Sequence, residues 1–277
     1  MSDPPNLIDR AALSRNRARA LAQGADLFLH DEAAAEAEER LGEVNKRFTD
    51  PAVVTAFPAP WAEILPGARI VADEEVLALE EGAHDLVIHA LSLHWSADLV
   101  GQLIQCRRAL RPDGLFLGVL FGGRTLSELR VALAEAESRL TGGLSPRVLP
   151  MAEIRDLGAL LQRAGFALPV ADTVKKTVTY ATLFHLIADL RAMGEGNALA
   201  ARSRRAAPRA LFPAAAEIYA AAFPAGGGRI AATFEMIWLT GWAPDPSQPK
   251  PLRPGSAVQR LADALGATEA PLPRAED

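Results

Sequence analysis

The sequence predicts an α/β fold built on a mostly parallel, twisted sheet. Residues 86–93 form a continuous apolar run, which is typical of a strand buried on both faces. An apolar stripe at helical spacing follows over residues 99–110, and after Pro112 and Gly114 comes a second apolar run, residues 115–120. Ser96 is expected to cap this helix, with Asp98 in its first turn. A strand, a crossover helix and a strand make a βαβ unit, which requires parallel pairing and a right-handed connection.

Residues 1–48 are predicted to form a helical N-terminal extension. Asp9 is a suitable N-cap for a helix over residues 10–22, and Gly24 is a suitable residue to end it. A second helix is expected over residues 26–46, with small and apolar residues on one side and acidic residues mostly on the other. These helices could cap a ligand cleft, or they could cover an edge or face of the sheet, and both alternatives stay open.

The main domain is expected over residues 49–267. It begins with a short strand at residues 52–57, and the space before Asp73 allows only an abbreviated helix and one more strand. After the βαβ unit, apolar spacing and turn residues predict helix 125–140, helix 151–164, strands 166–170 and 174–180 in a hairpin-like pair, helix 181–193 and strand 230–240. Residues 181–222 are interpreted as a helical lid insertion, and residues 268–277 as a disordered tail.

Charge and hydropathy argue against two classes of protein. The formal net charge of -5 is atypical of a nucleic-acid binder with a broad basic surface. No apolar run approaches the roughly 20 residues that a membrane-spanning helix needs, and the N-terminal residues contain no apolar core of a signal peptide. We therefore expect a soluble protein without a transmembrane segment, located in the cytoplasm.

Cysteine and histidine usage predicts neither a disulfide nor a metal centre. The single cysteine, Cys106, lies within the crossover helix, where it is expected to be a small buried hydrophobe in a reducing compartment. His84, His89 and His94 are five residues apart, and this odd spacing sends neighbours to opposite faces of a strand. No spacing typical of metal ligands stands out elsewhere, so a metal enzyme is disfavoured.

Several motifs in this chain resemble one known family. They are DLVIHALSLHW at residues 85–95, LRPDGLF at 110–116, and the segments 69–75, 190–199 and 232–242. Together they resemble the class I S-adenosylmethionine-dependent methyltransferases, in the branch that includes the malonyl-carrier-protein methyltransferase of biotin synthesis and the respiratory complex I assembly factor of methyltransferase fold. The last two segments are specific to the complex I assembly type. The resemblance implies a Rossmann-like class I methyltransferase fold that binds S-adenosylmethionine.

The resemblance also implies where the cofactor site lies. Its residues would be Asp73, Glu74, Ala90, Leu91, Ser92, His94 and Trp95, most of them at the carboxyl end of the strand in residues 86–93, where open α/β sheets bind ligands. Asp73 matches the family aspartate that contacts the adenine amino group, although it could equally cap a short helix after its strand. Trp95 could instead be ordinary core packing. Ser92, His94 and Arg124 are the candidates for orienting a methyl acceptor.

One part of the family pattern is missing. The cofactor loop that normally follows the first strand contains two or three glycines, because side chains there would block the approach of the cofactor. Here residues 51–67 contain Pro58 and Pro60 and no glycine cluster. The first half of the cofactor site is therefore predicted to be lost or rebuilt. A third, weaker possibility keeps a remodelled pocket for another adenine-containing ligand through Asp73.

Two functions from different classes remain. The first is a methyltransferase that uses S-adenosylmethionine and acts on a small acid or a protein-bound group, by in-line transfer that depends mostly on positioning. The second is a non-catalytic assembly factor of methyltransferase fold that binds a respiratory complex I subunit. Members of that branch are linked to arginine hydroxylation of a complex I subunit. The space beside Phe57 and Pro58 discriminates between the two, because an open cleft favours cofactor binding and a filled one favours the binding role.

Overall fold

The computed structural model describes residues 7–249, and the tail expected at residues 268–277 lies outside them. Contacts divide the chain into two compact units, Met1–Pro244 and Asp245–Asp277. Of the second unit only residues 245–249 are described, and they form a turn in which Gln248 N donates to Asp245 O. The first unit contains the predicted extension, the sheet and the predicted lid, and its fold is described below.

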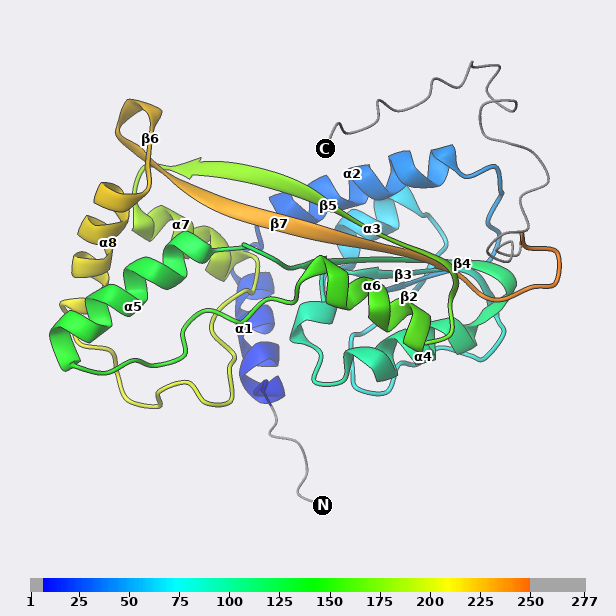
Figure 1. The fold of residues 1–277 in the computed structure, drawn as a ribbon, viewed down its shortest axis with the longest axis horizontal. Helices are drawn as coiled ribbons and strands as arrows, with labels where there is room; N and C mark the ends of the chain where they lie inside the picture. Colours follow the sequence, from blue (N-terminus) through cyan, green and yellow to red (C-terminus); the bar gives the residue numbers. More distant parts are fainter. Residues whose placement is uncertain (1–6, 250–277) are drawn as a thin grey trace, which may run out of the picture. The chain divides into compact units, whose positions relative to one another are not determined.

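A mixed sheet forms the centre of the first unit and confirms the predicted α/β class (Figure 1). Its order in the described residues is β2-β1-β3-β4-β7-β5, with the short β6 paired to β7. The first four strands pair in parallel and the last ones antiparallel. Their bounds are β1 Pro51–Val54, β2 Arg69–Val71, β3 His84–Ala90, β4 Leu110–Phe121, β5 Ala167–Tyr180, β6 Pro224–Ala225 and β7 Arg229–Trp242.

Helices cover both faces of this sheet, which explains the continuous apolar run in β3. Leu86 and Ile88 of β3 belong to a core that also contains residues of α2 (Phe28–Glu43) and α3 (Pro58–Ile64). Val87 belongs to the opposite core, with residues of α4 (Leu99–Ala109) and α6 (Ile154–Arg163). The successive side chains of residues 86–88 point into these two cores in turn, and both cores exclude water, so these side chains are apolar. The strand therefore lacks the alternation of apolar and polar residues that is typical of a strand with one exposed face.

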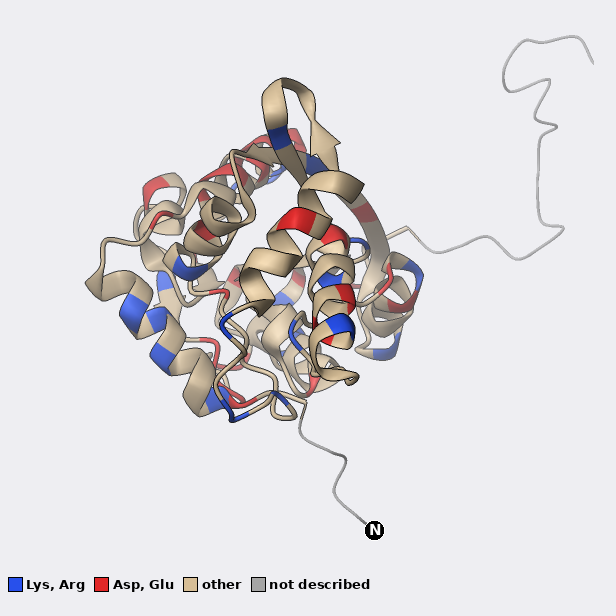
Figure 2. Ribbon diagram, turned by 90° about the vertical axis from the view of Figure 1, so that its left-hand side faces the viewer, with Lys and Arg blue, Asp and Glu red and all other residues tan. Residues whose placement is uncertain are grey.

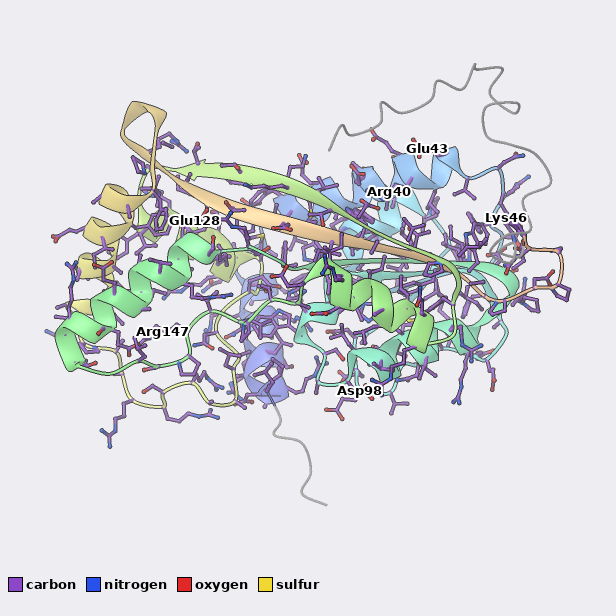
Figure 3. All side chains as sticks on the ribbon, viewed as in Figure 1. Arg40, Glu43, Lys46, Asp98, Glu128 and Arg147 are labelled. Carbon is purple, nitrogen blue, oxygen red and sulfur yellow. The ribbon has the colours of Figure 1, made fainter. Side chains whose placement is uncertain are left out.

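The predicted βαβ unit is present, but its helix is capped by a different residue. Asp98 is the N-cap of α4, and its carboxylate accepts a hydrogen bond from Gly101 N at 2.8 Å. Ser96, the expected cap, instead accepts from Asp98 N at 3.2 Å. The reason is that a short 3-10 turn, η1 Leu93–Trp95, follows β3 and delays the start of the helix. Asp98 is labelled in Figure 3.

Both N-terminal helices form as predicted, within small differences at their ends. Asp9 caps α1 (Arg10–Ala22) by accepting from Ala12 N at 2.9 Å. The second helix, α2, is shorter than residues 26–46 and covers the sheet (Figure 3). Its Arg40 lies over the Trp238 ring at 4.6 Å and donates to Asp172 of β5. We left open whether these helices cap a ligand cleft or cover the sheet, and α2 covers a face of the sheet.

The antiparallel part of the sheet corrects one prediction. Residues 167–180 form one strand, β5, rather than two strands of a hairpin, and β5 pairs along its length with β7. Its register shifts between Ala167 and Val170, where Leu168 has a positive φ of 49°. This bulge lies within the first of the two predicted strands. The predicted break at residues 171–173 coincides instead with a step in the alternation of burial, because Ala171 and Asp172 are both half-buried.

Three helices pack together at one end of the sheet, as Figure 1 shows, and we call them the lid region; the first of them lies outside residues 181–222, the predicted lid insertion. They are α5 (Ser127–Thr141), α7 (Leu183–Ala192) and α8 (Leu211–Ala222), and buried residues of all three join one core with β3 and β4. The turn after α8 contains the 3-10 segment η2 Gly226–Gly228. Among residues 7–249, every helix is too short or too polar to span a membrane.

Candidate functional site

The connection from β1 to α3 replaces the expected glycine loop with a tight turn. Thr55 Oγ1 accepts a hydrogen bond from Phe57 N at 3.1 Å, and Pro58 occupies the first position of α3, where a missing N–H costs nothing. Phe57 is fully buried: its ring lies 5.1 Å from that of His30 on α2 and against Gly194 after α7. The space beside Phe57 is therefore filled by side chains from α2 and by the backbone of the lid.

Asp73, after the end of β2, is held by arginines of α1. Its carboxylate accepts two hydrogen bonds from Arg17 Nη1, at 2.7 and 2.8 Å, and lies 3.5 Å from Arg10 Nη1. Arg17 and Asp73 are both buried. No helix follows β2 directly in the described structure, so the alternative of Asp73 as a helix cap is wrong. The Asp73 carboxylate is therefore the counter-ion of the buried Arg17 guanidinium. Arg17 belongs to α1, a helix that we predicted as part of the N-terminal extension.

A second buried carboxylate, Glu195, lies in the turn after α7. It accepts hydrogen bonds from Trp95 Nε1 at 2.8 Å and from His94 Nε2 at 3.3 Å. Burial raises the pKa of Glu195, but His94, Arg17 and Trp95 together outweigh that effect and lower it, so the carboxylate stays ionised. Trp95 is thus more than core packing, because its indole N–H orients Glu195.

Two buried histidines surround these carboxylates. His89 Nε2 lies 3.2 Å from Gln102 Oε1, whereas neither ring nitrogen of His30 has a hydrogen-bond partner among the described residues. Burial lowers the pKa of each to about 4, so both rings are neutral near pH 7. His94 lies close enough to His89 to contribute, after burial, to the lowering of the pKa of His89. No group of three His, Cys, Asp or Glu side chains that could hold a metal ion is found in residues 7–249.

Three of the residues expected to bind the cofactor, among them the expected adenine contact Asp73, line a cavity that is too small for an adenine ring. Asp73, Glu74 and Ser92 line a space of about 10 Å³, whereas small-molecule sites are typically about 300–1,000 Å³. One water molecule at most fits there. Ser92 Oγ donates to Ala90 O at 3.1 Å, and Leu91 is buried with a positive φ of 45°.

Arg124 is not brought to this cluster. It is exposed after the end of β4, its backbone N donates to Glu235 Oε2 at 2.9 Å, and it lines neither the small cavity nor the larger one described next. Of the three candidates for orienting an acceptor, Ser92 lines the small cavity and His94 contacts Glu195 beside the larger one. The structure therefore assembles two of the three candidates near the strand ends.

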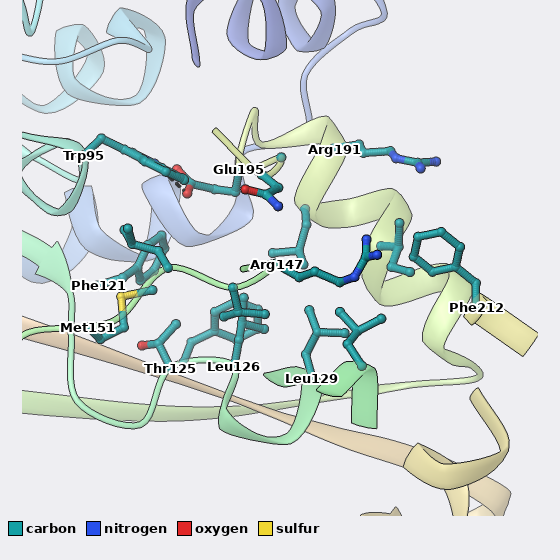
Figure 4. Close-up of a pocket in the computed structure, with 18 residues that line it drawn as sticks. Trp95, Phe121, Thr125, Leu126, Leu129, Arg147, Met151, Arg191, Glu195 and Phe212 are labelled. Carbon is teal, nitrogen blue, oxygen red and sulfur yellow. Dashed lines mark hydrogen bonds between the residues drawn. The ribbon is translucent and has the colours of Figure 1, made fainter. Parts of the chain in front are cut away.

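A larger cavity of about 210 Å³ opens between the strand ends and the lid (Figure 4). Its walls are mostly apolar side chains of β4, β7, the lid region and the segments before and after α5: Phe121, Leu126, Leu129, Leu133, Val148, Leu149, Met151, Ile187, Leu190, Phe212 and Phe234. Trp95 and Glu195 form one end. Arg147 also enters it, but its charge is balanced by Glu137 at 2.7 Å, and this contact, despite some burial, lowers the pKa of Glu137 to about 2.

The sequence analysis did not identify two residues of this site, Arg17 and His30, which lie on the buried faces of α1 and α2. Arg17 follows Leu13 by four residues and precedes Ala20 by three, so it occupies an apolar position of α1. His30 is placed in the same way before Ala34 of α2. A polar residue at an apolar position was the available signal, because such a residue needs a buried partner.

Comparisons with known proteins agree with this architecture. A family model described as a methyltransferase domain matches residues 56–118. The arginine-hydroxylase NDUFAF5 of Danio rerio is 40% identical over 199 residues, which are 72% of this chain and 62% of that protein. The malonyl-[acyl-carrier protein] O-methyltransferase of Nitrosospira multiformis is 34% identical over 177 residues, 64% of this chain and 55% of that protein. The chain thus aligns with less than two thirds of each relative's length.

One solved structure with a similar fold is a Haemonchus contortus phosphoethanolamine N-methyltransferase in complex with S-adenosylhomocysteine. It is 12% identical, with a TM-score of 0.43, and the match covers 77% of this chain and 53% of that one. The chain belongs to the S-adenosylmethionine-dependent methyltransferase superfamily. Within it, the chain is similar to the NDUFAF5 proteins and, at lower identity, to the biotin-synthesis methyltransferases, so it is a methyltransferase-like protein of that branch.

The comparisons overturn the expected location. The NDUFAF5 relatives bear the word mitochondrial in their names, and this contradicts the cytoplasmic location that we expected from the sequence. The expectation rested on the lack of an apolar signal-peptide core, which says nothing about organelles that read other signals.

Proposed function

We propose that this protein is a binding factor in the assembly of respiratory complex I, and that its adenosine site is closed by its own N-terminal helices. The observation that carries the proposal is the insertion of Arg17 onto Asp73, the carboxylate that would otherwise receive the adenine amino group. The similarity to NDUFAF5 supports the complex I role, and the filled strand ends support a role in binding rather than methyl transfer.

Three features that S-adenosylmethionine would need in its site are already occupied or replaced by protein groups. The Asp73 carboxylate accepts hydrogen bonds from Arg17, and the turn with the buried Phe57 replaces the glycine loop that normally follows the first strand. Only about 10 Å³ of free space remains beside Asp73. S-adenosylmethionine could enter only if α1 moved, and this movement would leave Asp73 and Arg17 without their counter-ions. A buried charge that loses its partner is strongly unfavourable, so the closed arrangement opposes entry.

Isothermal titration calorimetry with S-adenosylmethionine and S-adenosylhomocysteine tests the closed site, after any co-purified ligand has been removed. We expect no binding at about 1 mM ligand, which corresponds to a binding free energy weaker than about -4 kcal/mol. The Arg17→Ala variant is the comparison, because it removes the side chain that occupies Asp73; circular dichroism must first show that it folds with Asp73 unpaired. A micromolar affinity of the natural protein would contradict the proposal and make methyl transfer the leading function.

Complementation tests the assembly role. Cells that lack the gene should assemble less complex I, and Ser92→Ala and Glu74→Gln variants should restore assembly as well as the natural protein does. These two variants alter the expected cofactor cluster without removing a buried charge pair. Restored assembly by the natural protein and failure by both variants, at equal protein levels, would show that the cofactor cluster is used.

Methyl transfer to a small acid or a protein is the second candidate, favoured by the family to which the chain belongs. The name of the zebrafish relative adds a third chemistry, hydroxylation of arginine. Mass spectrometry of co-purified complex I subunits, from cells with and without the gene, separates these outcomes. An added methyl group indicates transfer, an added oxygen atom indicates hydroxylation, and unchanged subunits that still co-purify agree with the binding role.

A further inference from the structure

A second cavity adjoins the apolar one and has the opposite character. Its volume is about 290 Å³, and it is lined by Asn16, Arg19 and Gln23 of α1 and its C-terminal end, and by Arg191 and Gly196 on the lid side. Arg191 and Gly196 also line the apolar cavity, so the two spaces are adjacent and share these residues as a common wall. Figure 4 shows the Arg191 side chain directed away from the apolar side chains of the first cavity.

The charge in this second cavity is positive, and no acidic side chain lines it. Arg19 and Arg191 are both exposed, and neither makes an ion pair with a described residue. α1 contains no acidic residue, and its basic residues are visible in Figure 2. Both arginines lie in the last turns of their helices, whose carboxyl ends each carry about half a negative charge. Two full positive charges outweigh these partial charges, so the cavity attracts an anion.

At the boundary between the two cavities, the Asn16 side chain packs closely against the backbone of Gly196. Asn16 Nδ2 donates to Gly196 O at 3.0 Å, and a Cβ at position 196 would lie 2.9 Å from that nitrogen. Glu195, the preceding residue, lines the apolar cavity but is already paired with His94 and Trp95. Arg17 is the nearby cation that offsets part of the Glu195 charge, so the repulsion of an anion bound outside the boundary is reduced.

We propose that the two cavities together bind a single-chain amphiphile with an anionic head. The head lies between Arg19 and Arg191, and the apolar chain enters the cavity lined by Leu129 and Ile187. The charge of the outer cavity selects the head, and the apolar walls of the inner one select the chain, because burial of apolar surface from water drives its entry. This site is separate from the closed adenosine region and does not depend on the proposed function.

Calorimetry with three probes tests the two halves of the site in the full-length protein. Decanoate carries both the anionic head and the chain, decylamine carries the same chain with a cationic head, and acetate carries the head alone. Decyl phosphate, as a fourth probe, distinguishes a phosphate head from a carboxylate. We expect decanoate or decyl phosphate to bind at least about ten-fold more tightly than decylamine and acetate. Equal binding of decylamine, or no binding of either anionic amphiphile, would overturn the proposal.

Variants assign the binding to these cavities. Reversing the charges with Arg19→Glu and Arg191→Glu should weaken decanoate binding about ten-fold or more, whereas Arg209→Glu, an exposed arginine that lines neither cavity, should leave it unchanged. Ile187→Trp should block the chain and weaken decanoate without changing the affinity for acetate. Circular dichroism checks that each variant is folded. If neither the double reversal nor Ile187→Trp weakens binding, the amphiphile binds elsewhere and the proposal is wrong.

Discussion

The pair of Arg17 and Asp73 decides the character of the strand ends. Each group is buried, and each is the main counter-charge of the other, with Arg10 as a second, more exposed cation. Charges removed from water are tolerated only when they are paired, so neither residue can be changed alone without a large cost. The family resemblance implies that Asp73 contacts a ligand. In the folded chain, Asp73 instead links α1 to the end of β2.

Removing one partner of this pair should destabilise the fold. Asp73→Ala is expected to lower the free energy of unfolding by about 3–5 kcal/mol, because it leaves the Arg17 guanidinium buried without its counter-ion. Arg17→Met combined with Asp73→Ala should cost less than Asp73→Ala alone. Urea denaturation measures both, with Glu80→Ala in the exposed pair with Arg69 as the control of little effect. Additive costs of the two changes would contradict this account.

The buried histidines predict how stability depends on pH. His30 and His89 have folded-state pKa values of about 4, against a value of 6.5 when exposed. Between these values the unfolded chain binds more protons than the folded one, so stability falls as the pH is lowered from about 6.5 toward 4. The expected loss is about 2 kcal/mol for each histidine between about pH 7.5 and pH 5.

Denaturation curves at several pH values measure this loss. His30→Phe should reduce the slope below about pH 6.5 by about half, because one of the two neutral imidazoles is gone. His185→Gln is the control, since His185 is exposed near the start of α7 and contacts Thr182. A stability that stays flat down to about pH 5 would show that these rings can be protonated in the folded protein.

At the scale of elements, the turn after α7 connects the lid to the strand ends. Gly194 follows α7 with a positive φ of 75°, and a Cβ there would lie 2.9 Å from the Phe57 ring and 3.0 Å from Arg17 Cγ. A glycine is required for both reasons, the backbone conformation and the close approach. This single turn holds the lid against Phe57, α1 and, through the following Glu195, Trp95.

A side chain at this turn should loosen the lid. Gly194→Ala is expected to lower the free energy of unfolding by about 1–3 kcal/mol and to speed hydrogen exchange in α7. Gly143→Ala is the matched control, because Gly143 is exposed after α5 and has an ordinary φ, and a Cβ added there would lie 4.0 Å from its nearest neighbour, Thr141 Oγ1. Equal stability of the two variants would show that the turn adapts without cost.

At the scale of the whole molecule, the N-terminal helices are part of the main core. Ile8, Ala12 and Leu13 pack with Trp95, and residues of α2 pack with β3 and α7. A segment that shares its core with the sheet cannot unfold independently without exposing apolar surface on both sides. The first compact unit therefore begins with the extension and includes it.

Unfolding of this unit should be a single cooperative transition. Helix content, followed by far-ultraviolet circular dichroism, and tryptophan fluorescence should report the same midpoint in urea, because α1 and α2 are lost together with the sheet that holds Trp238. An early loss of helix signal before the change in fluorescence would show that the N-terminal helices form a separate, weaker unit.

Local sequence determined most of the elements of this protein. The helix capped by Asp9, most of the strand predicted at residues 86–93 and the crossover helix that ends before Pro112 follow from apolar spacing, caps and breakers, which act over a few residues. The strand itself ends at Ala90, because a 3-10 turn begins at Leu93. The same rules misplaced the cap of α4 and split β5, because a 3-10 turn delays the start of the helix and the burial of β5 stops alternating at Ala171 and Asp172. The loss of the glycine loop was also predictable, since glycine and proline act locally.

Only the tertiary structure decided what fills the space that this loop leaves. Arg17 is 56 residues from Asp73, and Glu195 is about 100 residues from His94 and Trp95, and no local pattern in the sequence pairs them. Whether a carboxylate receives a ligand or a buried arginine depends on which helix lies above it. That choice is set by the packing of whole elements, because a buried charge is stable only next to a partner that the rest of the fold brings to it.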